Sequence, residues 1–415
     1  MQIKLDHIAK IEGHMGFVAD IINGKVQDAR LQVTEGARLI EGILLGRHYY
    51  EAPEITSRIC GVCPVVHNLA SIKALEAALG VDSSEQTKGL RRLMILGQTI
   101  HSHCLHLFFF SLGDFFGIAS DLDLIKKRLE ETQTALAVRN FGNQIIKIIG
   151  GRIIHPLTTD IDGFRKLPDK NDLLKIKKLG KRILPQAIDL IEIFLNLEYP
   201  QIERGTEYIS LAATKEYAFY DGNIKSTKGL NIPEERFMFD IQEIELINDV
   251  AKRPLHQDKS FMVGALARIN NNAHQLSNQA KYLLREYKLV LPCYNPFYNI
   301  FSQAIEIVHC VEESIRLVDK LLAKPLKDDK IDYKIKAGQG VGAVEAPRGT
   351  LYHYYEIDDK GLIKHCNLIT PTVQNLANLE ADLTKFLPKF KTSHVKEQIK
   401  MLVRAYDPCI TCATH

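Results

Sequence analysis

Two Cys-x-x-Cys pairs lie near opposite ends of the sequence and have the composition of a metal site. The first pair is Cys60 and Cys63, and the second is Cys409 and Cys412. Two cysteines three positions apart can direct both sulfurs at one centre, so the pairs together offer four thiolates to a soft transition metal. The pattern therefore predicts that the two ends of the chain meet at a single metal centre.

A histidine follows each cysteine pair. His67 lies four residues after Cys63. It therefore faces the same side of a helix as Cys63 and can support a metal ligand through a hydrogen bond. His415 lies three residues after Cys412 and is the last residue of the sequence. This spacing favours a role for His415 as a ligand of a neighbouring hard cation.

The main alternative at this level is a structural zinc site, because four-cysteine zinc sites are common. Zinc ribbons, however, usually hold both pairs within a few tens of residues. Here most of the chain separates the pairs, and Cys63 opens a predicted helix with Pro64 in its first turn. A zinc-clipped scaffold protein stays an alternative, and metal analysis would distinguish it.

The composition excludes several other classes of protein. The chain has 415 residues, of which 46% are hydrophobic and 25% charged, as in ordinary globular proteins. Its formal charge is only +3, and no basic block is interleaved with aromatics, so nucleic-acid binding has no support. We expect no membrane span, because no run of about 18 uncharged apolar residues occurs. The other cysteines are expected to be buried free thiols in a reducing compartment: Cys104, Cys293, Cys310 and Cys366.

The hydrophobic pattern predicts an N-terminal hairpin followed mainly by helices. Residues 2–34 alternate between apolar and polar, with a turn at Asn23-Gly24. Gly338-Gln339-Gly340-Val341-Gly342 is interpreted as a turn that allows close backbone approach, since no helix follows it. Helices are predicted at 38–45, from Cys63, at 84–119, 121–150, 170–196, 270–290, 298–323 and 373–405, with short strands and turns at 201–255 and a mixed region at 333–370.

Eight motifs, in order along the chain, resemble those of the nickel–iron hydrogenase large subunit. The two cysteine signatures are the strongest of them. Two departures are Lys10 in place of arginine and Val373-Gln374-Asn375 where the family often has a tryptophan. The motifs are Ile11-Glu12-Gly13-His14, Glu41 with Arg47, Arg58 to His67, His101 to His106 leading to Asp114, Gly150 to Pro156, Glu345-Ala346-Pro347-Arg348-Gly349, Pro371-Thr372 with Asn375, and Asp407 to His415.

The resemblance implies a helix-dominant α+β fold with long central helices and small N-terminal and mid-chain sheets. The active site would be buried where both termini converge. The whole chain, 1–415, would be one large-subunit domain. Its regions would be an N-terminal sheet (1–36), a helical core with the first cysteine pair (37–200), a mixed region (201–370), and a C-terminal helix with the second pair (371–415).

The resemblance also implies a nickel–iron centre. Nickel would bind all four thiolates, with Cys60 and Cys409 terminal and Cys63 and Cys412 bridging to an iron that has one carbon monoxide and two cyanide ligands. Pro347, Arg348 and Thr372 would form the cyanide pocket, because a guanidinium and a hydroxyl are suitable donors. Asp114 would be the counter-ion that orients Arg348.

The implied reaction is reversible heterolytic cleavage of dihydrogen to protons and electrons. Cys409 would accept the proton first, Glu12 would relay it outward, and His67 would support the site. Glu41, His415 and the backbone carbonyl of Leu368 would bind magnesium or a similar cation, since such hard ions take oxygen ligands and water.

The same resemblance implies partners, because this sequence lacks a nucleotide-binding Gly-x-Gly-x-x-Gly motif and further clustered cysteines. Electrons would leave through an iron–sulfur small subunit toward flavin, nicotinamide, deazaflavin or heterodisulfide-linked subunits. The features are most similar to the cytoplasmic, cofactor-coupled hydrogenases. A maturation endopeptidase would remove a tail beyond His415 after nickel insertion. The remaining alternatives are a hydrogen-sensing subunit and a complex I-like electron-transfer subunit, although the latter family lacks the cysteine pairs.

Overall fold

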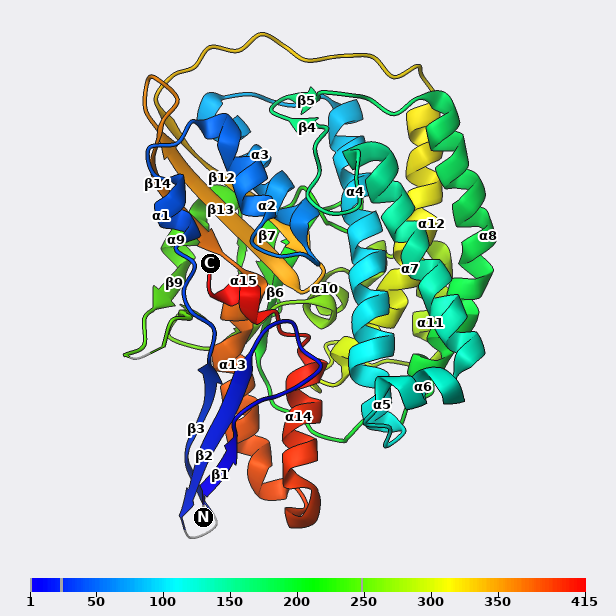
Figure 1. Cartoon of the computed structure of the whole chain (residues 1–415), viewed down its shortest axis with the longest axis vertical. Coiled ribbons are helices and arrows are strands. Elements are labelled where there is room, and N and C mark those ends of the chain that lie inside the picture. Colours follow the sequence, from blue (N-terminus) through cyan, green and yellow to red (C-terminus); the bar gives the residue numbers. More distant parts are fainter. Residues whose placement is uncertain (1, 23–24, 248) are drawn as a thin grey trace.

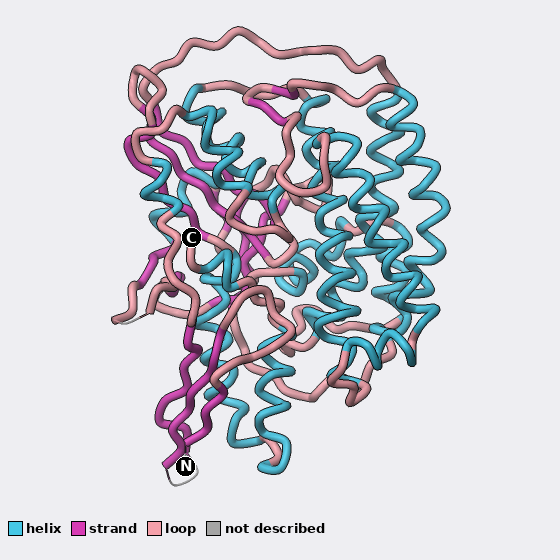
Figure 2. Tube along the Cα trace, viewed as in Figure 1, coloured by secondary structure: helices cyan, strands magenta, loops and turns pink. Residues whose placement is uncertain are grey.

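The computed structural model describes residues 2–22, 25–247 and 249–415. Helices dominate the chain, and small sheets lie beside a bundle of long helices (Figure 1). Figure 2 shows most of the strands on one side of the molecule, with the C-terminus at mid-height on that side. The predicted helix-dominant α+β fold is confirmed.

The N-terminal sheet has the predicted antiparallel arrangement. Its order is β1 (Gln2–Leu5), β2 (Met15–Ile22) and β3 (Lys25–Val33). Met15, Phe17 and Ala19 of β2 are buried on one face, as the period of two in a strand requires. The sheet packs against α13 (Pro371–Phe386), so the N-terminal and C-terminal segments lie side by side (Figure 1). The predicted turn at Asn23-Gly24 lies outside the described residues.

The helix that follows the first cysteine pair packs flat against a strand. Helix α3 (Pro64–Leu79) begins directly after Cys63, as predicted, and contacts β12 (Gly338–Ala346) along its length. The glycine-rich segment is therefore a strand and not the predicted turn, although it does allow close backbone approach. Cβ atoms added to its three glycines would lie within 2.5 Å of carbonyl oxygens of α3: Gly338 at Ala78, Gly340 at Ala74 and Gly342 at Ala70.

Four long helices form the bundle. These are α4 (Glu85–Cys104), α7 (Leu129–Gly150), α8 (Lys170–Leu195) and α12 (Tyr298–Leu322). The shorter helices are α1 (Ile40–Leu44), α2 (Ala52–Ser57), α5 (Leu112–Phe115), α6 (Asp121–Lys127), α9 (Phe237–Asp240), α10 (Ala265–Asn272), α11 (Asn278–Glu286), α14 (Val395–Ala405) and α15 (Ile410–Ala413), together with 3-10 helices at Tyr49–Glu51, Glu234–Arg236, Ala273–Gln275, Leu387–Lys389 and Thr392–His394.

Several predicted helices are divided. The segment predicted at 84–119 is one helical run that passes from α4 through a π-helical stretch, Leu105–Ser111, into α5. The segment predicted at 121–150 divides at Arg128 into α6 and α7. The predicted helix at 373–405 is wrong as a single element, because Pro388 lies between α13 and α14 and proline cannot continue a helix interior.

By length and composition alone, one helical run among the described residues is long and apolar enough to cross a membrane, although the sequence has no uncharged apolar run of that length. It is Glu85–Phe115, and 78% of its most apolar window is buried inside the protein. That burial is what a central helix of a folded core requires, since its apolar side chains pack against neighbouring helices.

The middle of the chain contains short strands, as predicted. The hairpin of β12 and β13 continues into β14 and forms an antiparallel sheet of order β12-β13-β14. The remaining strands are β4 (Thr159–Asp160), β5 (Gly163–Phe164), β6 (Glu207–Ala212), β7 (Asn223–Ser226), β8 (Asn231–Ile232), β9 (Ile241–Ile244), β10 (Arg253–His256), β11 (Phe261–Met262), β13 (Gly349–Ile357) and β14 (Ile363–Ile369).

Candidate metal centre

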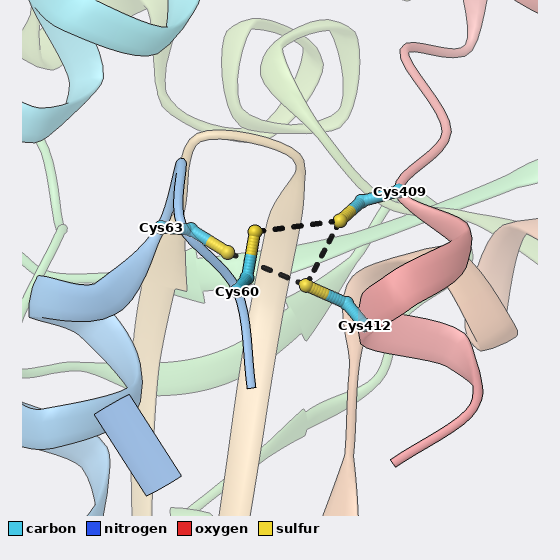
Figure 3. A group of neighbouring side chains, drawn as sticks. All are labelled: Cys60, Cys63, Cys409 and Cys412. Atoms are coloured by element: carbon cyan, nitrogen blue, oxygen red, sulfur yellow. Dashed lines mark hydrogen bonds between the residues drawn. The ribbon is translucent and has the colours of Figure 1, made fainter. Parts of the chain in front are cut away.

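The four cysteine sulfurs of the two signatures converge on one buried point, as the sequence predicted (Figure 3). All four lie within 4.8 Å of one another. The separations are 3.6 Å between Cys60 and Cys409, 3.3 Å between Cys63 and Cys412, and 3.0 Å between Cys409 and Cys412. Sulfurs bonded to one metal at about 2.3 Å are at most about 4.6 Å apart, so the arrangement fits a shared metal.

The electrostatics of the four thiols also favour a cation. The hydrogen bond with Cys409 is the largest cause that holds the pKa of Cys60 well below its ordinary value. The pKa values of Cys63 and Cys412 are raised, first of all by their interactions with Cys409. Four buried thiolates repel one another, so they can ionise together only around a positive ion.

Both ends of the chain hold the second cysteine pair in place. Ile410 N donates to Glu12 O at 2.7 Å, and Glu12 N donates to Pro408 O at 3.4 Å. The main chain of Glu12 therefore lies beside Cys409. Burial raises the pKa of the Glu12 carboxyl above its ordinary value, and the nearby Cys60 raises it further. Arg38 binds the same segment, since its guanidinium donates to Thr411 O. None of the sequence motifs contained Arg38.

Arg348 lies over the site but has a different counter-ion from the predicted one. Its Nε donates to Asp407 O at 2.8 Å and to Asp407 Oδ1 at 3.0 Å, and its Nη2 lies 2.9 Å from the same Oδ1. Asp114 instead pairs with Arg404. The reason is local: Asp407 has a positive φ of 50°, which turns the chain between the Arg404 helix and the cysteine signature. Asp407 could have been noticed from its place beside Cys409.

A small cavity joins Arg348 to the sulfurs. Arg348 Nη1 is buried and has no hydrogen-bond partner among the described residues. Thr372 Oγ1 accepts from Cys409 N at 2.9 Å and keeps its own hydroxyl proton for another acceptor. The cavity is lined by Cys63, His67, Ala346, Pro347, Arg348, Leu351, Pro371, Thr372, Cys409 and Cys412.

His67 contacts the second cysteine pair, although it comes from the helix after the first. Its Nε2 lies 3.6 Å from Cys412 Sγ. Burial lowers the pKa of His67 to about 3, so the imidazole is neutral and has one N–H to donate. The ring of His353 lies 5.7 Å from that of His67, centroid to centroid. His353 is fully buried, and none of the sequence motifs contained it.

A second group of polar atoms lies beside the sulfurs at the C-terminus. His415 Nε2 lies 2.7 Å from Leu368 O and 4.0 Å from Glu41 Oε1. His415 Nδ1 lies 2.7 Å from Cys412 O, and Leu368 N donates to Glu41 Oε1 at 2.8 Å. A neutral imidazole has a single N–H, so only one of its two carbonyl neighbours can accept a hydrogen bond from it.

Comparisons with known proteins agree with the chemistry of this site. A family profile described as nickel-dependent hydrogenase matches residues 38–149 and 216–415. The alpha subunits of sulfhydrogenases 1 and 2 from Pyrococcus furiosus are 36% and 34% identical to the chain, matched over 100% of it and over 98% and 99% of their own lengths. A solved structure of an NAD+-reducing NiFe-hydrogenase in its H2-reduced state has a TM-score of 0.91 and 27% identity, with 100% of this chain and 99% of that chain covered. Because the profile covers most of the sequence and the relatives match it throughout, the chain belongs to the nickel-dependent hydrogenases.

Proposed function

We propose that the chain is the catalytic large subunit of a hydrogenase whose centre is nickel bound by Cys60, Cys63, Cys409 and Cys412. The convergence of the four sulfurs beside a buried guanidinium is the observation that carries this proposal. Cys63 and Cys412 would bridge to iron. When bound, the nickel–iron centre supplies the place where dihydrogen is split heterolytically into protons and electrons.

The pocket beside the sulfurs suits small anionic ligands on iron. An unpaired, buried N–H of Arg348 needs an acceptor, since a buried donor without one costs about 1–3 kcal/mol. Cyanide offers such an acceptor, and the Thr372 hydroxyl can donate to a second one. Pro347 lines the same cavity. We therefore propose that the iron has two cyanide ligands in this pocket, with one carbon monoxide ligand inferred from the family resemblance alone.

Glu12 is the residue best suited to carry the proton away from Cys409. Its main chain is bonded to both neighbours of that cysteine, and its carboxyl is partly buried with a raised pKa. A carboxyl whose pKa lies nearer neutrality exchanges a proton more readily in both directions. Arg348, held by Asp407, would fix the electrostatic field over the same site.

Glu41, His415 and the carbonyl of Leu368 would bind a magnesium or similar cation. On an octahedron with bonds of about 2.1 Å, neighbouring ligands are about 3.0 Å apart and opposite ligands about 4.2 Å apart. The separations of 2.7 Å and 4.0 Å around His415 Nε2 are close to these values. A cation between Nε2 and the carbonyl would also leave Nδ1 as the single donor, to Cys412 O.

An iron–sulfur subunit would cover the outer side of the first cysteine loop. Tyr50 and Leu157 line one shallow hollow there and are 52% and 47% exposed. The Leu157 loop is attached just before the cysteines, since His155 Nδ1 lies 2.9 Å from Ser57 O. Exposed apolar side chains of this kind suit a stable partner.

Further carrier subunits, a cytoplasmic location and a maturation endopeptidase are proposals from the family resemblance. The alpha subunits of Pyrococcus furiosus support a multi-subunit enzyme, because their names identify one subunit of several.

The test of the function is dihydrogen-dependent electron transfer by the natively matured complex. We expect reduction of a soluble viologen dye under dihydrogen, and dihydrogen evolution from the reduced dye. The matched control is Cys409→Ser, because serine keeps the size of the side chain and is a poor ligand for a soft metal. A parent enzyme with bound nickel and iron but neither activity would contradict the proposal and favour a hydrogen-sensing subunit.

A further inference from the structure

One fully buried arginine binds the main chain immediately before Arg348. Arg268 on α10 is 0% exposed. Its Nη1 donates to Ala346 O at 2.9 Å, and its Nη2 donates to Pro347 O at 2.9 Å. These are the two carbonyls that precede Arg348, at the tip of the β12–β13 hairpin. The guanidinium therefore fixes the orientation of two successive peptide groups from which the Arg348 side chain extends.

Every other donor of the same guanidinium is also satisfied. Arg268 Nε donates to Glu306 Oε1 at 2.6 Å, and Nη2 donates to Glu306 Oε2 at 2.7 Å. Nη1 donates to Glu345 Oε2 at 2.8 Å. A guanidinium has five N–H groups, and all five find acceptors here, so the group cannot rotate without breaking hydrogen bonds.

The two carboxylates that hold Arg268 are themselves held by other groups. Tyr217 donates to Glu306 Oε1 at 2.7 Å, and His103 Nε2 lies 2.8 Å from Glu306 Oε2. On the other side, Glu345 Oε1 accepts from Leu211 N at 2.7 Å and from the Thr350 hydroxyl at 2.7 Å. The network therefore joins helices α10, α12 and α4 to the hairpin as one rigid assembly.

The hairpin tip needs such a support. Gly349 has φ of +134°, and the tip packs against Val263 and Gly264 so closely that a Cβ at Gly349 would lie 2.4 Å from a methyl group of Val263. The side chain of Arg348 then reaches Asp407 and leaves Nη1 in the cavity beside the sulfurs. A small rotation of either preceding peptide would move Nη1 away from that cavity.

We propose that Arg268 is a positioning residue for the hydrogenase reaction: it sets the direction of the Arg348 guanidinium at the metal centre by binding the carbonyls of Ala346 and Pro347. Arg268 itself does not line the cavity, and it forms no hydrogen bond with the four cysteines; it acts through the main chain of Ala346 and Pro347. The proposal rests on the proposed pocket for iron-bound cyanide, and its test separates the two claims.

The test uses Arg268→Lys with a matched buried arginine as control. Arg91 is also 0% exposed and also binds a glutamate with two nitrogens, at 2.6 Å and 2.8 Å to Glu76. Among the described residues, Arg91 forms no hydrogen bond or ion pair with the hairpin tip. Arg91→Lys therefore also removes a buried guanidinium, but at a site away from the hairpin tip. It should show the loss of thermal stability that such a removal causes by itself.

We expect Arg268→Lys to keep nickel and iron, to lower kcat between about tenfold and a hundredfold, and to shift the cyanide bands in the infrared spectrum. Arg91→Lys, at a similar loss of Tm, should leave the bands in place and kcat within a few-fold of the parent. Identical bands and equal kcat in the two variants would overturn the proposal.

A second variant serves if Arg268→Lys does not mature. Glu306→Gln removes one of the two charges that hold Arg268, and among the described residues Glu306 forms no hydrogen bond with the hairpin tip. Shifted bands in this variant support the same conclusion, and unshifted bands with normal kcat contradict it. If the parent enzyme itself has nickel and activity but no cyanide bands, the cyanide assignment fails. The positioning role is then decided by kcat, which must fall in Arg268→Lys or Glu306→Gln and not in Arg91→Lys.

Discussion

Arg348 and Asp407 form a buried ion pair that ties the tip of the β12–β13 hairpin to the residue two positions before Cys409. The guanidinium holds both the carbonyl and the carboxylate of Asp407, at 2.8 Å and 3.0 Å from Nε. This one ion pair therefore fixes the Arg348 guanidinium beside the sulfurs and also fixes the segment that leads to Cys409. The N-terminal segment reaches the same signature through Glu12, so three distant parts of the chain define one site.

Arg348→Lys should lower turnover by about a hundredfold or more, with the metals retained. Lysine keeps the charge but loses the planar group that contacts Asp407 and the cavity at once. Dye reduction and metal content measure the two effects. The control is Arg404→Lys, whose arginine binds Asp114 and Ala9 O outside the cavity and should stay within a few-fold of the parent. Near-normal turnover in Arg348→Lys would show that Arg348 has only a structural role.

Asp407→Asn should destabilise the protein by about 3 kcal/mol, because it leaves the Arg348 cation buried without its counter-charge. The matched variant Asp114→Asn should cost less, since the carboxylate of Asp114 is less buried and faces Arg404. Thermal unfolding of the two variants compares them directly. A larger loss in Asp114→Asn would show that the Arg348–Asp407 pair contributes less to stability than the Arg404–Asp114 pair and would contradict this prediction.

Glu12→Gln should leave both metals bound and slow the exchange of dihydrogen with deuterated water. Glutamine keeps the shape of the side chain and removes the titratable group. Glu12→Asp retains a carboxyl and should keep a measurable part of the rate. Mass spectrometry of the evolved gas follows the exchange, and an unchanged rate in Glu12→Gln would remove Glu12 from the proton path.

Glu41→Gln should lose the divalent cation and unfold at a lower temperature. The substitution removes the charged carboxylate from the cation's two proposed side-chain ligands. A drop of several degrees in Tm, together with magnesium content below one per chain, is the expected result. His365→Ala is the control, since His365 is exposed on the same strand β14 and faces away from the cation ligands. Full cation content in Glu41→Gln would contradict the assignment.

The sequence was most informative where chemistry constrains the spacing of residues. Two Cys-x-x-Cys pairs can serve one metal only if both ends of the chain meet, and the observed sulfurs do meet. Helix α3 was predicted to begin after Cys63 because Pro64 suits the first turn of a helix, where its missing N–H needs no partner. Such signals depend on neighbours in sequence.

Features that depend on tertiary packing could not be predicted in this way. Whether Asp114 or Asp407 is the counter-ion of Arg348 depends on where α14 ends in the folded structure. No local sequence pattern indicates that position. The glycines of β12 were recognised as permitting close approach, but the helix they approach is distant in sequence. The sequence around Arg268 does not distinguish it from an arginine on the surface of a helix. Only the folded structure shows that two glutamates and two carbonyls surround its guanidinium.

The most direct test of the central claim is metal analysis of the natively matured protein combined with infrared spectroscopy. We predict nickel and iron in equal amounts, with absorption bands of carbon monoxide and cyanide that disappear in Cys409→Ser. Zinc alone, bound by the four cysteines without such bands, would contradict it.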